Sequence, residues 1–189
     1  WEKGAWLGKG EYRWYNGVNF FHTAWLGRNV GEPSQVQAGL NRVPFGVGPY
    51  GPANSWFFDL HYYVGLSDDM DVGIKWTRKK GRLRTDLAYY LMAEPNGQGA
   101  SEDSARYSYD VVENGDPYGH YRERHQVNAR AIVSCFLETL PTSVGVSLQA
   151  GRLAAAGGSG ADDTLAYAAA LHSSSTLGPW NLKLQLTQY

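Results

Sequence analysis

The chain has 189 residues, a formal net charge of −1 and a mean hydropathy of −0.42. This polarity excludes a bundle of membrane helices, and 14% aromatic residues exclude a disordered chain. The near-zero net charge does not favour a nucleic-acid partner, and the single cysteine, Cys135, excludes an internal disulfide. The length predicts one domain over residues 1–189.

Apolar and polar residues alternate with a period of two along most of the chain, which predicts β-strands rather than helices. In chain order, the segments that alternate or are rich in aromatic residues are 11–27, 35–41, 56–66, 70–77, 82–93, 126–135, 143–150, 165–172 and 180–187. Turn residues such as Pro141 and Pro179 bound them. With the aromatic segments counted in, we expect an all-β antiparallel fold of about ten or eleven strands.

Two architectures match such a series of strands. In a soluble β-sandwich or barrel, the apolar faces form a shared core. In a transmembrane β-barrel, the apolar face contacts lipid and the polar face lines a wet interior. The predicted strands are long compared with the five or six residues typical of soluble sheets, and Trp and Tyr concentrate where strands meet turns, as at a membrane interface. We therefore expect a transmembrane barrel, with the soluble form as the alternative.

One region resembles a family of Gram-negative outer-membrane porins. Its motifs are residues 39–46 (GLNRVPFG), 49–52 (PYGP), 56–58 (WFF), 62–66 (YYVGL) and 68–75 (DDMDVGIK). Residues 106–112 (RYSYDVV) and 126–130 (QVNAR) are also similar to that family. The resemblance covers residues 39–130, and strand periodicity alone describes the rest of the chain.

The resemblance implies a β-barrel pore in the outer membrane of a Gram-negative bacterium. Such a pore allows passive diffusion of small polar solutes, needs no cofactor and usually forms a trimer within the lipid bilayer. Two features depart from the family pattern. Family members are longer chains with more strands, and Tyr189 is preceded at alternate positions by the polar residues Thr187, Gln185 and Lys183. Residues 1–189 are therefore expected to form either a whole barrel or part of a larger one.

Charged side chains on the water-facing side of a pore decide which solutes pass. The polar positions expected to line the lumen are Asp59, His61, Asp71, Lys75, Arg82, Arg84, Asp86, Arg122, Arg124, Arg130 and Lys183. Basic residues outnumber acidic ones in this set, so we expect a mild preference for anions. Solvated positions at the rim are the alternative, above all for Arg82, Arg122 and Arg124.

A segment rich in proline and glycine follows residue 42. Proline lacks the N–H that a central strand needs, so this segment must leave the sheet, and it is too apolar for a fully solvated loop. We expect it to fold into the lumen and narrow the pore, and a loop at the rim or at a subunit contact is the alternative. The residues assigned to this constriction loop are Pro44, Phe45, Gly46, Pro49, Tyr50 and Pro52.

Other chemistries are poorly supported. Asp68, Asp69 and Asp71 lack the glycine and the distal glutamate of a helix-loop-helix calcium site, so a turn that starts a strand is expected there. The histidines lack metal-binding spacing, and the sequence contains no G-x-S-x-G nucleophile elbow. We therefore expect neither a metal site nor an enzyme. The alternative function is carbohydrate binding by a soluble, aromatic-rich β-sheet.

Overall fold

The structure of the chain is a computed structural model. It describes residues 1–15, 17–31, 33–48, 51–52, 61, 65–95, 98–99, 121–137, 140–155 and 162–189. Most of the predicted strand at 56–66 and the whole segment 106–112 lie outside the described residues. Among the described residues, no helix has the length and apolar character needed to cross a membrane.

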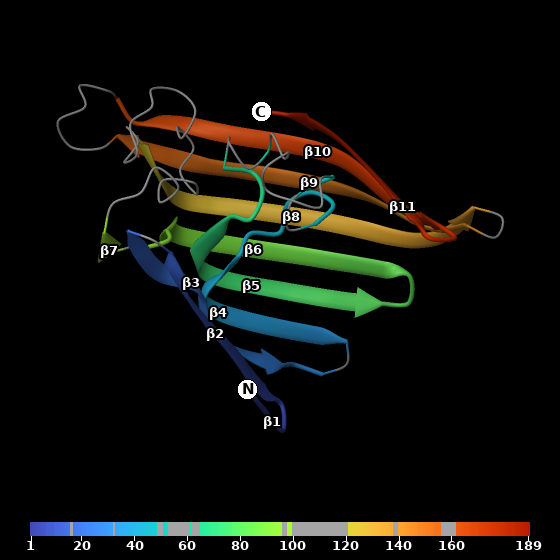
Figure 1. Ribbon diagram of the computed structural model, residues 1–189, viewed down its shortest axis with the longest axis horizontal. Coiled ribbons are helices and arrows are strands. Elements are labelled where there is room, and N and C mark those ends of the chain that lie inside the picture. The colour runs from blue at the N-terminus through green and yellow to red at the C-terminus, as the bar shows by residue number, and fades with distance from the viewer. Residues whose placement is uncertain are drawn as a thin grey trace.

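Every element with defined bounds is a β-strand. The strands are β1 (Glu2–Lys3), β2 (Trp6–Tyr15), β3 (Val18–Asn29), β4 (Ser34–Arg42), β5 (Met70–Lys80), β6 (Leu83–Ala93), β7 (Gln98–Gly99), β8 (Tyr121–Leu137), β9 (Leu140–Ala155), β10 (Thr164–Leu177) and β11 (Trp180–Gln188). All pairings are antiparallel and follow the order β1-β2-β3-β4-β5-β6-β8-β9-β10-β11, while β7 pairs with β3 off this path (Figure 1). The predicted all-β antiparallel fold is confirmed.

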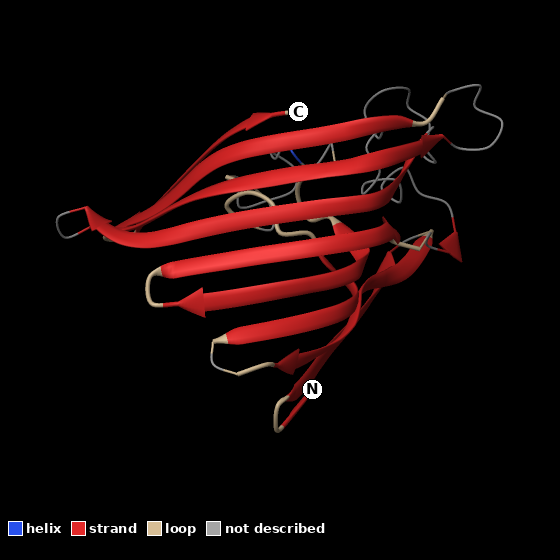
Figure 2. Ribbon diagram, turned by 180° about the vertical axis from the view of Figure 1, so that it is seen from behind, coloured by secondary structure: helices blue, strands red, loops and turns tan. Residues whose placement is uncertain are grey.

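The sheet bends into an open arc. The pairing path ends at β1 on one side and at β11 on the other, and no described residue pairs these two edges. The strands are long: β8, β9 and β10 have 17, 16 and 14 residues, compared with about five or six in a typical soluble sheet. The arc has a convex side, which faces the viewer in Figure 2, and a concave side, on which residues 43–48 and 65–69 lie.

Three irregularities in the ladder contribute to the bend. β3 has an extra residue, His22, opposite the Glu11–Tyr12 step of β2, and β6 has an extra residue, Leu91, opposite the Val72–Gly73 step of β5. Between Arg124 and Val127, β8 has one residue more than β9. An extra residue in one strand bends it, increases its twist and reverses which face the following side chains occupy. The polar frame read from the sequence is therefore continuous only between these positions.

The two faces of the sheet differ sharply in polarity. Apolar side chains exposed on the convex face include Ile74, Leu87, Tyr89, Leu91, Val127, Val144, Val146, Leu148, Leu171, Leu182 and Leu184. Polar side chains buried on the concave face include His22, Asn41, Asp71, Asp86, Gln126, Asn128, Ser147 and His172. This distribution is the reverse of a water-soluble sheet, in which the apolar face is the buried one.

A small apolar core lies on the concave side. Val43, Phe45 and Leu66, from the segments between β4 and β5, belong to a buried cluster that also contains residues of β6 and β10. The sheet contributes Ala88 and Tyr90 from β6 and, from β10, small alanine residues at 168 and 170. Because alanine side chains are short, they leave room for Val43, Phe45 and Leu66 to pack against the concave face.

Candidate functional site

The centre of the concave face is an ion-pair cluster around Asp86 of β6, whose side chain is 0% exposed. Arg130 of β8 contacts Oδ2 of Asp86 through Nη2 at 2.9 Å, and Arg84 contacts the same oxygen through Nε at 3.1 Å. Thr77 of β5 donates its hydroxyl to Oδ1 at 2.7 Å. One carboxylate is therefore shared by two guanidinium groups, and the cluster keeps a net positive charge.

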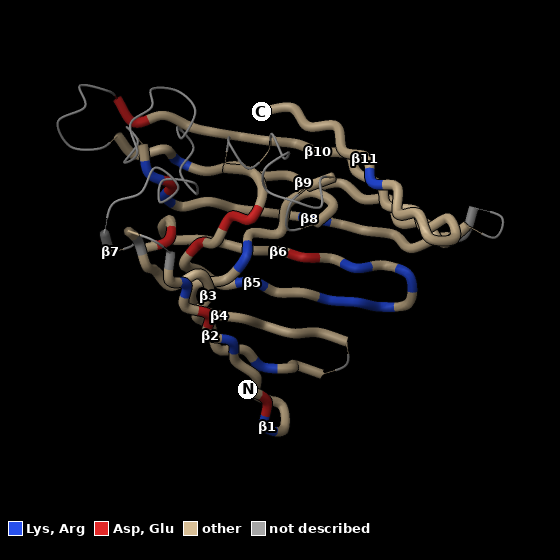
Figure 3. The backbone as a smooth tube through the Cα atoms, in the orientation of Figure 1, with Lys and Arg blue, Asp and Glu red and all other residues tan. Residues whose placement is uncertain are grey.

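Two further cations extend this positive region towards the end of β4. Lys75 donates from Nζ to the carbonyl oxygen of Arg42 at 2.7 Å, and Arg42 donates from Nη2 to Oδ1 of Asp68 at 2.9 Å. A cavity of about 270 Å³ lies between these groups and the segment that follows β4. Its charged lining consists of Arg42, Lys75, Arg84 and Arg130 together with Asp68 and Asp69. Basic side chains outnumber acidic ones in this lining. The basic positions of the β5–β6 hairpin are coloured blue along the backbone in Figure 3.

Residues 43–48, which follow β4 and are called the inward segment below, cross the concave face as far as β9 and β11. The amide of Gly46 donates to Oγ of Ser147 at 3.0 Å, and the amide of Val47 donates to Oε1 of Gln185 at 3.0 Å. Arg130 donates from Nη1 to the carbonyl oxygen of Gly46 at 3.2 Å. Gly46 has φ of +65°, and a Cβ atom there would lie 2.5 Å from Oε1 of Gln185. Only glycine fits this conformation and this contact without strain.

The structure describes four of the six residues assigned to the constriction loop. Pro44 and Phe45 are buried against the concave face, and Pro52 is half-buried. Pro49 and Tyr50 lie outside the described residues. The segment does leave the sheet and enter the arc, as the proline content predicts, whereas narrowing of a pore stays a prediction.

The anchor of this segment is a pair of residues that sequence reasoning did not connect. Oγ of Ser147 on β9 lies 3.2 Å from Nε2 of His172 on β10. His172 is paired in register with Gly145, and its ring lies so close that a Cβ atom at position 145 would collide with it. Both side chains occupy polar positions of alternating strands, but only the register of β9 against β10 brings them together.

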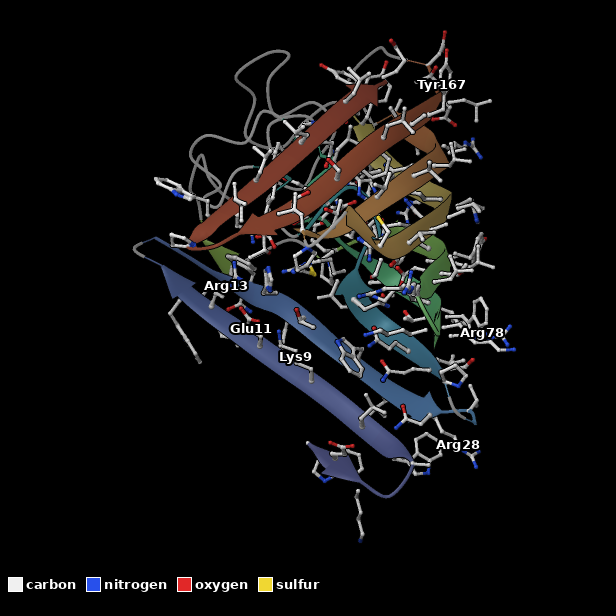
Figure 4. All side chains as sticks on the ribbon, turned by 90° about the vertical axis from the view of Figure 1, so that its right-hand side faces the viewer. Lys9, Glu11, Arg13, Arg28, Arg78 and Tyr167 are labelled. Carbon is white, nitrogen blue, oxygen red and sulfur yellow. The ribbon has the colours of Figure 1, made fainter. Side chains whose placement is uncertain are left out.

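A second missed cluster lies on β2 and β3. Glu11 contacts Lys9 at 3.0 Å and Arg13 at 2.7 Å, and its Oε1 lies 3.3 Å from Nδ1 of His22. Figure 4 shows Lys9, Glu11 and Arg13 pointing from β2 into the space enclosed by the arc, whereas Arg78 and Tyr167 point away from it. Lys9, Glu11 and Arg13 alternate regularly in β2, but His22 is the extra residue of β3, so the alternation of β3 does not predict its place beside Glu11.

Most of the other predicted lumen residues also lie on the concave side. Asp71 is fully buried and accepts a hydrogen bond from Nε2 of Gln126 at 3.1 Å. Nε2 of His61 lies 2.9 Å from Oγ1 of Thr187 on β11. Lys183 is half-buried, and it occupies the same frame of β11 as Gln185, which contacts the inward segment.

Three predicted lumen residues occupy other positions. Arg82 is exposed in the turn between β5 and β6. Arg122 and Arg124 pair in register with Ala154 and Arg152 of β9, which belong to the convex frame of that strand. The prediction that these two arginines lie on the concave, lumen-facing side is wrong, because the register shift between Arg124 and Val127 reverses the frame at the start of β8. Asp59 lies outside the described residues.

The concave face thus combines fixed basic charge, buried hydrogen-bonding groups and an apolar segment held against them. Such a surface can orient and attract small anions through guanidinium and ammonium groups. Comparisons of the chain with protein-family models, with curated proteins and with solved structures found no match.

Proposed function

We propose that the chain forms the wall of a water-filled pore in the outer membrane of a Gram-negative bacterium. Small polar solutes would diffuse through it passively, with a mild preference for anions. The observation that supports this function best is the sidedness of the sheet, in which the convex face is apolar and exposed and the concave face is polar and buried. Transmembrane barrels have this arrangement because lipid surrounds the outer face.

The exposed apolar side chains of the convex face would be costly in water. Leu165, Leu171 and Leu186 are 77%, 60% and 73% exposed, and they are part of a larger set spread over six neighbouring strands. Full burial of each such side chain is worth about 1.5–3 kcal/mol, so leaving a whole row in water would cost well over 10 kcal/mol. Lipid removes that cost. A soluble carbohydrate-binding sheet would need a second layer over this face, and no described residue provides one.

Aromatic side chains near strand ends also support a membrane location. Trp6 and Trp180 are the first residues of β2 and β11, and Trp14 is the last but one of β2. All three are exposed, as is Tyr167 near the start of β10. Tryptophan and tyrosine concentrate at membrane–water interfaces, where one end of the ring system is apolar and the other is hydrated.

A pore requires that the two edges of the arc be joined. The unpaired edges are those of β11 and of the β1–β2 end, and a strand edge in lipid would leave backbone N–H and C=O groups without partners. We therefore propose that additional strands of a longer protein close the barrel. In keeping with the porin resemblance, we propose a trimer as the functional assembly.

The anion preference follows from the cavity on the concave face. Arg84 and Arg130 share one carboxylate, that of Asp86, and Lys75 adds a further positive charge. The segment around Gly46 lies across these groups and would narrow the path beside them. A solute moving through the arc would pass close to fixed positive charge, which favours anions.

We propose that the protein is a channel rather than an enzyme and uses no cofactor. The Ser147–His172 pair could suggest a nucleophile and a base. However, Ser147 is fully buried, and its Oγ accepts the amide of Gly46. The pair therefore serves as the anchor of the inward segment.

Conductance in planar lipid bilayers tests this proposal. The protein should give discrete current steps, and the reversal potential in a potassium chloride gradient should favour chloride over potassium. A protein that stays monomeric in water without detergent and gives no current steps would refute the pore. Clear cation selectivity in a conducting protein would refute only the proposed role of the basic cavity, and it would leave the pore itself standing.

A further inference from the structure

Three carboxylates meet at the end of the sheet where the pairing of β5 with β6 shifts register. Asp69 immediately precedes β5, Asp71 lies within it, and Glu94 immediately follows β6. Asp71 pairs in register with Ala93, so the antiparallel pairing of β5 with β6 brings Glu94 beside the two aspartates. One carboxylate oxygen from each residue lies within 4.8 Å of those from the other two.

The two aspartates of this cluster lack the full compensation that buried acids normally have. Asp69 is 2% exposed, and among the described residues neither of its carboxylate oxygens has a hydrogen-bond partner. Oδ1 of Asp71 is equally unpartnered, although Gln126 donates to its Oδ2. Burial and the neighbouring charges of Asp71, Glu94 and Asp68 raise the pKa of Asp69 well above its usual value, and the backbone amide of Met70 offsets this only in part.

The neighbouring Asp68 differs from Asp69 because it has cationic partners. Asp68 is also buried, but Arg42 lies 2.9 Å from it and Arg13 lies 3.9 Å from it. Asp69 and Asp71 have no such ion pair with any described basic side chain. A buried carboxylate without a cation is costly, and buried charges in proteins are normally paired or coordinate a metal.

We propose that Asp69, Asp71 and Glu94 bind one hard divalent cation, preferentially Ca²⁺. Calcium takes oxygen ligands at about 2.3–2.6 Å, so two oxygens on one ion can be at most about 5 Å apart, which matches the spacing of this cluster. Three carboxylates in an irregular arrangement suit calcium better than magnesium, which demands near-octahedral geometry and usually keeps several waters. Waters would complete the coordination.

The site lies at the base of the segment that enters the arc, where a bound ion would stabilise the structure. The carbonyl oxygen of Asp69 accepts the amide of Val43 at 3.0 Å, and Val43 begins the segment that enters the arc. Asp69 also lines the cavity together with Lys75 and Arg130. A bound cation would hold the base of the inward segment against β5 and β6, and it would offset negative charge beside the basic cavity.

Equilibrium dialysis with ⁴⁵Ca²⁺ tests the site directly on the folded protein in detergent after treatment with a chelator. We expect saturable binding of one ion per chain, with a Kd of about 10⁻⁴ to 10⁻³ M, as in extracellular calcium modules. Asp69→Asn should weaken binding by about tenfold or more, because affinity depends on ligand charge. The matched control, Asp162→Asn, removes an exposed acid elsewhere and should bind as the unmodified protein does.

Thermal unfolding separates a binding site from a merely structural acid. Calcium should raise the Tm of the unmodified protein and of Asp162→Asn, but not that of Asp69→Asn. In chelator, Asp69→Asn should unfold at the same temperature as the unmodified protein or a higher one, because the substitution removes repulsion.

Absence of saturable binding, or binding and stabilisation unaffected by Asp69→Asn, would overturn the inference. Because dialysis does not depend on conductance, calcium binding without current steps would refute the pore and leave this site standing.

Discussion

Arg130 joins the buried carboxylate of Asp86 to the inward segment. Its Nε and Nη2 lie 3.0 Å and 2.9 Å from Oδ2 of Asp86, while its Nη1 donates to the carbonyl oxygen of Gly46 at 3.2 Å. One guanidinium group therefore connects β6, β8 and the segment between β4 and β5. The charge of the cavity and the position of the segment depend on the same residue.

Removing the shared carboxylate should be strongly destabilising. Asp86→Asn leaves Arg84 and Arg130 without their common partner, and breaking a buried ion pair from one side typically costs about 3–5 kcal/mol. Urea unfolding in lipid vesicles would measure this loss, and the double variant Asp86→Asn/Arg130→Gln should recover part of it. Asp163→Asn, which breaks an exposed pair with Arg152, should cause a much smaller change. Equal losses of unfolding free energy in Asp86→Asn and Asp163→Asn would contradict the assignment of Asp86 to a buried ion-pair cluster.

Gly46 should control the position of the inward segment. Gly46→Ala places a methyl group against the Gln185 side chain, so the segment should move away from β11 and single-channel conductance should rise. Gly31→Ala is the matched control, because Gly31 has a similar φ of +71° and no atom within 4 Å of its added Cβ. Both variants carry backbone strain, but only the first should change conductance. If both changed it alike, the segment would not be the narrowing element.

The basic cavity should set ion selectivity. Lys75→Gln and Arg84→Gln each remove one positive charge from the cavity lining, so the preference for chloride over potassium should fall in each variant. Lys80→Gln removes the same charge from the exposed end of β5 and should leave the reversal potential nearly unchanged. An equal shift in Lys80→Gln would mean that the cavity has no special role.

Charge on the convex face should be far more costly than charge on the concave face. Leu148 is exposed on the convex side of β9, and the next residue, Gln149, lies on the concave side, where it accepts a hydrogen bond from Asn128. Leu148→Arg should reduce the free energy of unfolding in lipid by about 2–4 kcal/mol, the cost of arginine at the bilayer midplane. Gln149→Arg should cost clearly less. The reverse order would contradict the proposed lipid face.

The strands and their faces could be predicted from the sequence wherever the alternation is unbroken. In β5 and β6, the polar frame placed Lys75 and Asp86 on one side and Ile74 and Leu87 on the other, as the structure has them. At the start of β8 the alternation gives the wrong face for Arg124, because a β-bulge exchanges the two faces of the strand there. No residue type in the sequence marks the position of this bulge.

Contacts between distant segments could not be predicted at all. The approach of Gly46 to Ser147 joins residues that are 101 positions apart, and it depends on the register of several strands. Proline content showed only that the segment must leave the sheet. Similarly, the sequence around Asp69 and Asp71 predicts only a turn that starts a strand, because Glu94 is distant in sequence and meets them only through the pairing of β5 with β6.

Single-cysteine scanning of β9 distinguishes a convex face in contact with lipid, as proposed, from a convex face in contact with water. Cys135 is the only cysteine, so a Cys135→Ser background allows one cysteine at a time at positions 146 to 149 of β9. Each would be labelled with a fluorophore before the protein is refolded into vesicles with brominated lipid. We predict strong quenching by lipid at 146 and 148 and weak quenching at 147 and 149. Equal quenching at all four positions, or no lipid quenching at 146 and 148, would show that the convex face does not contact lipid.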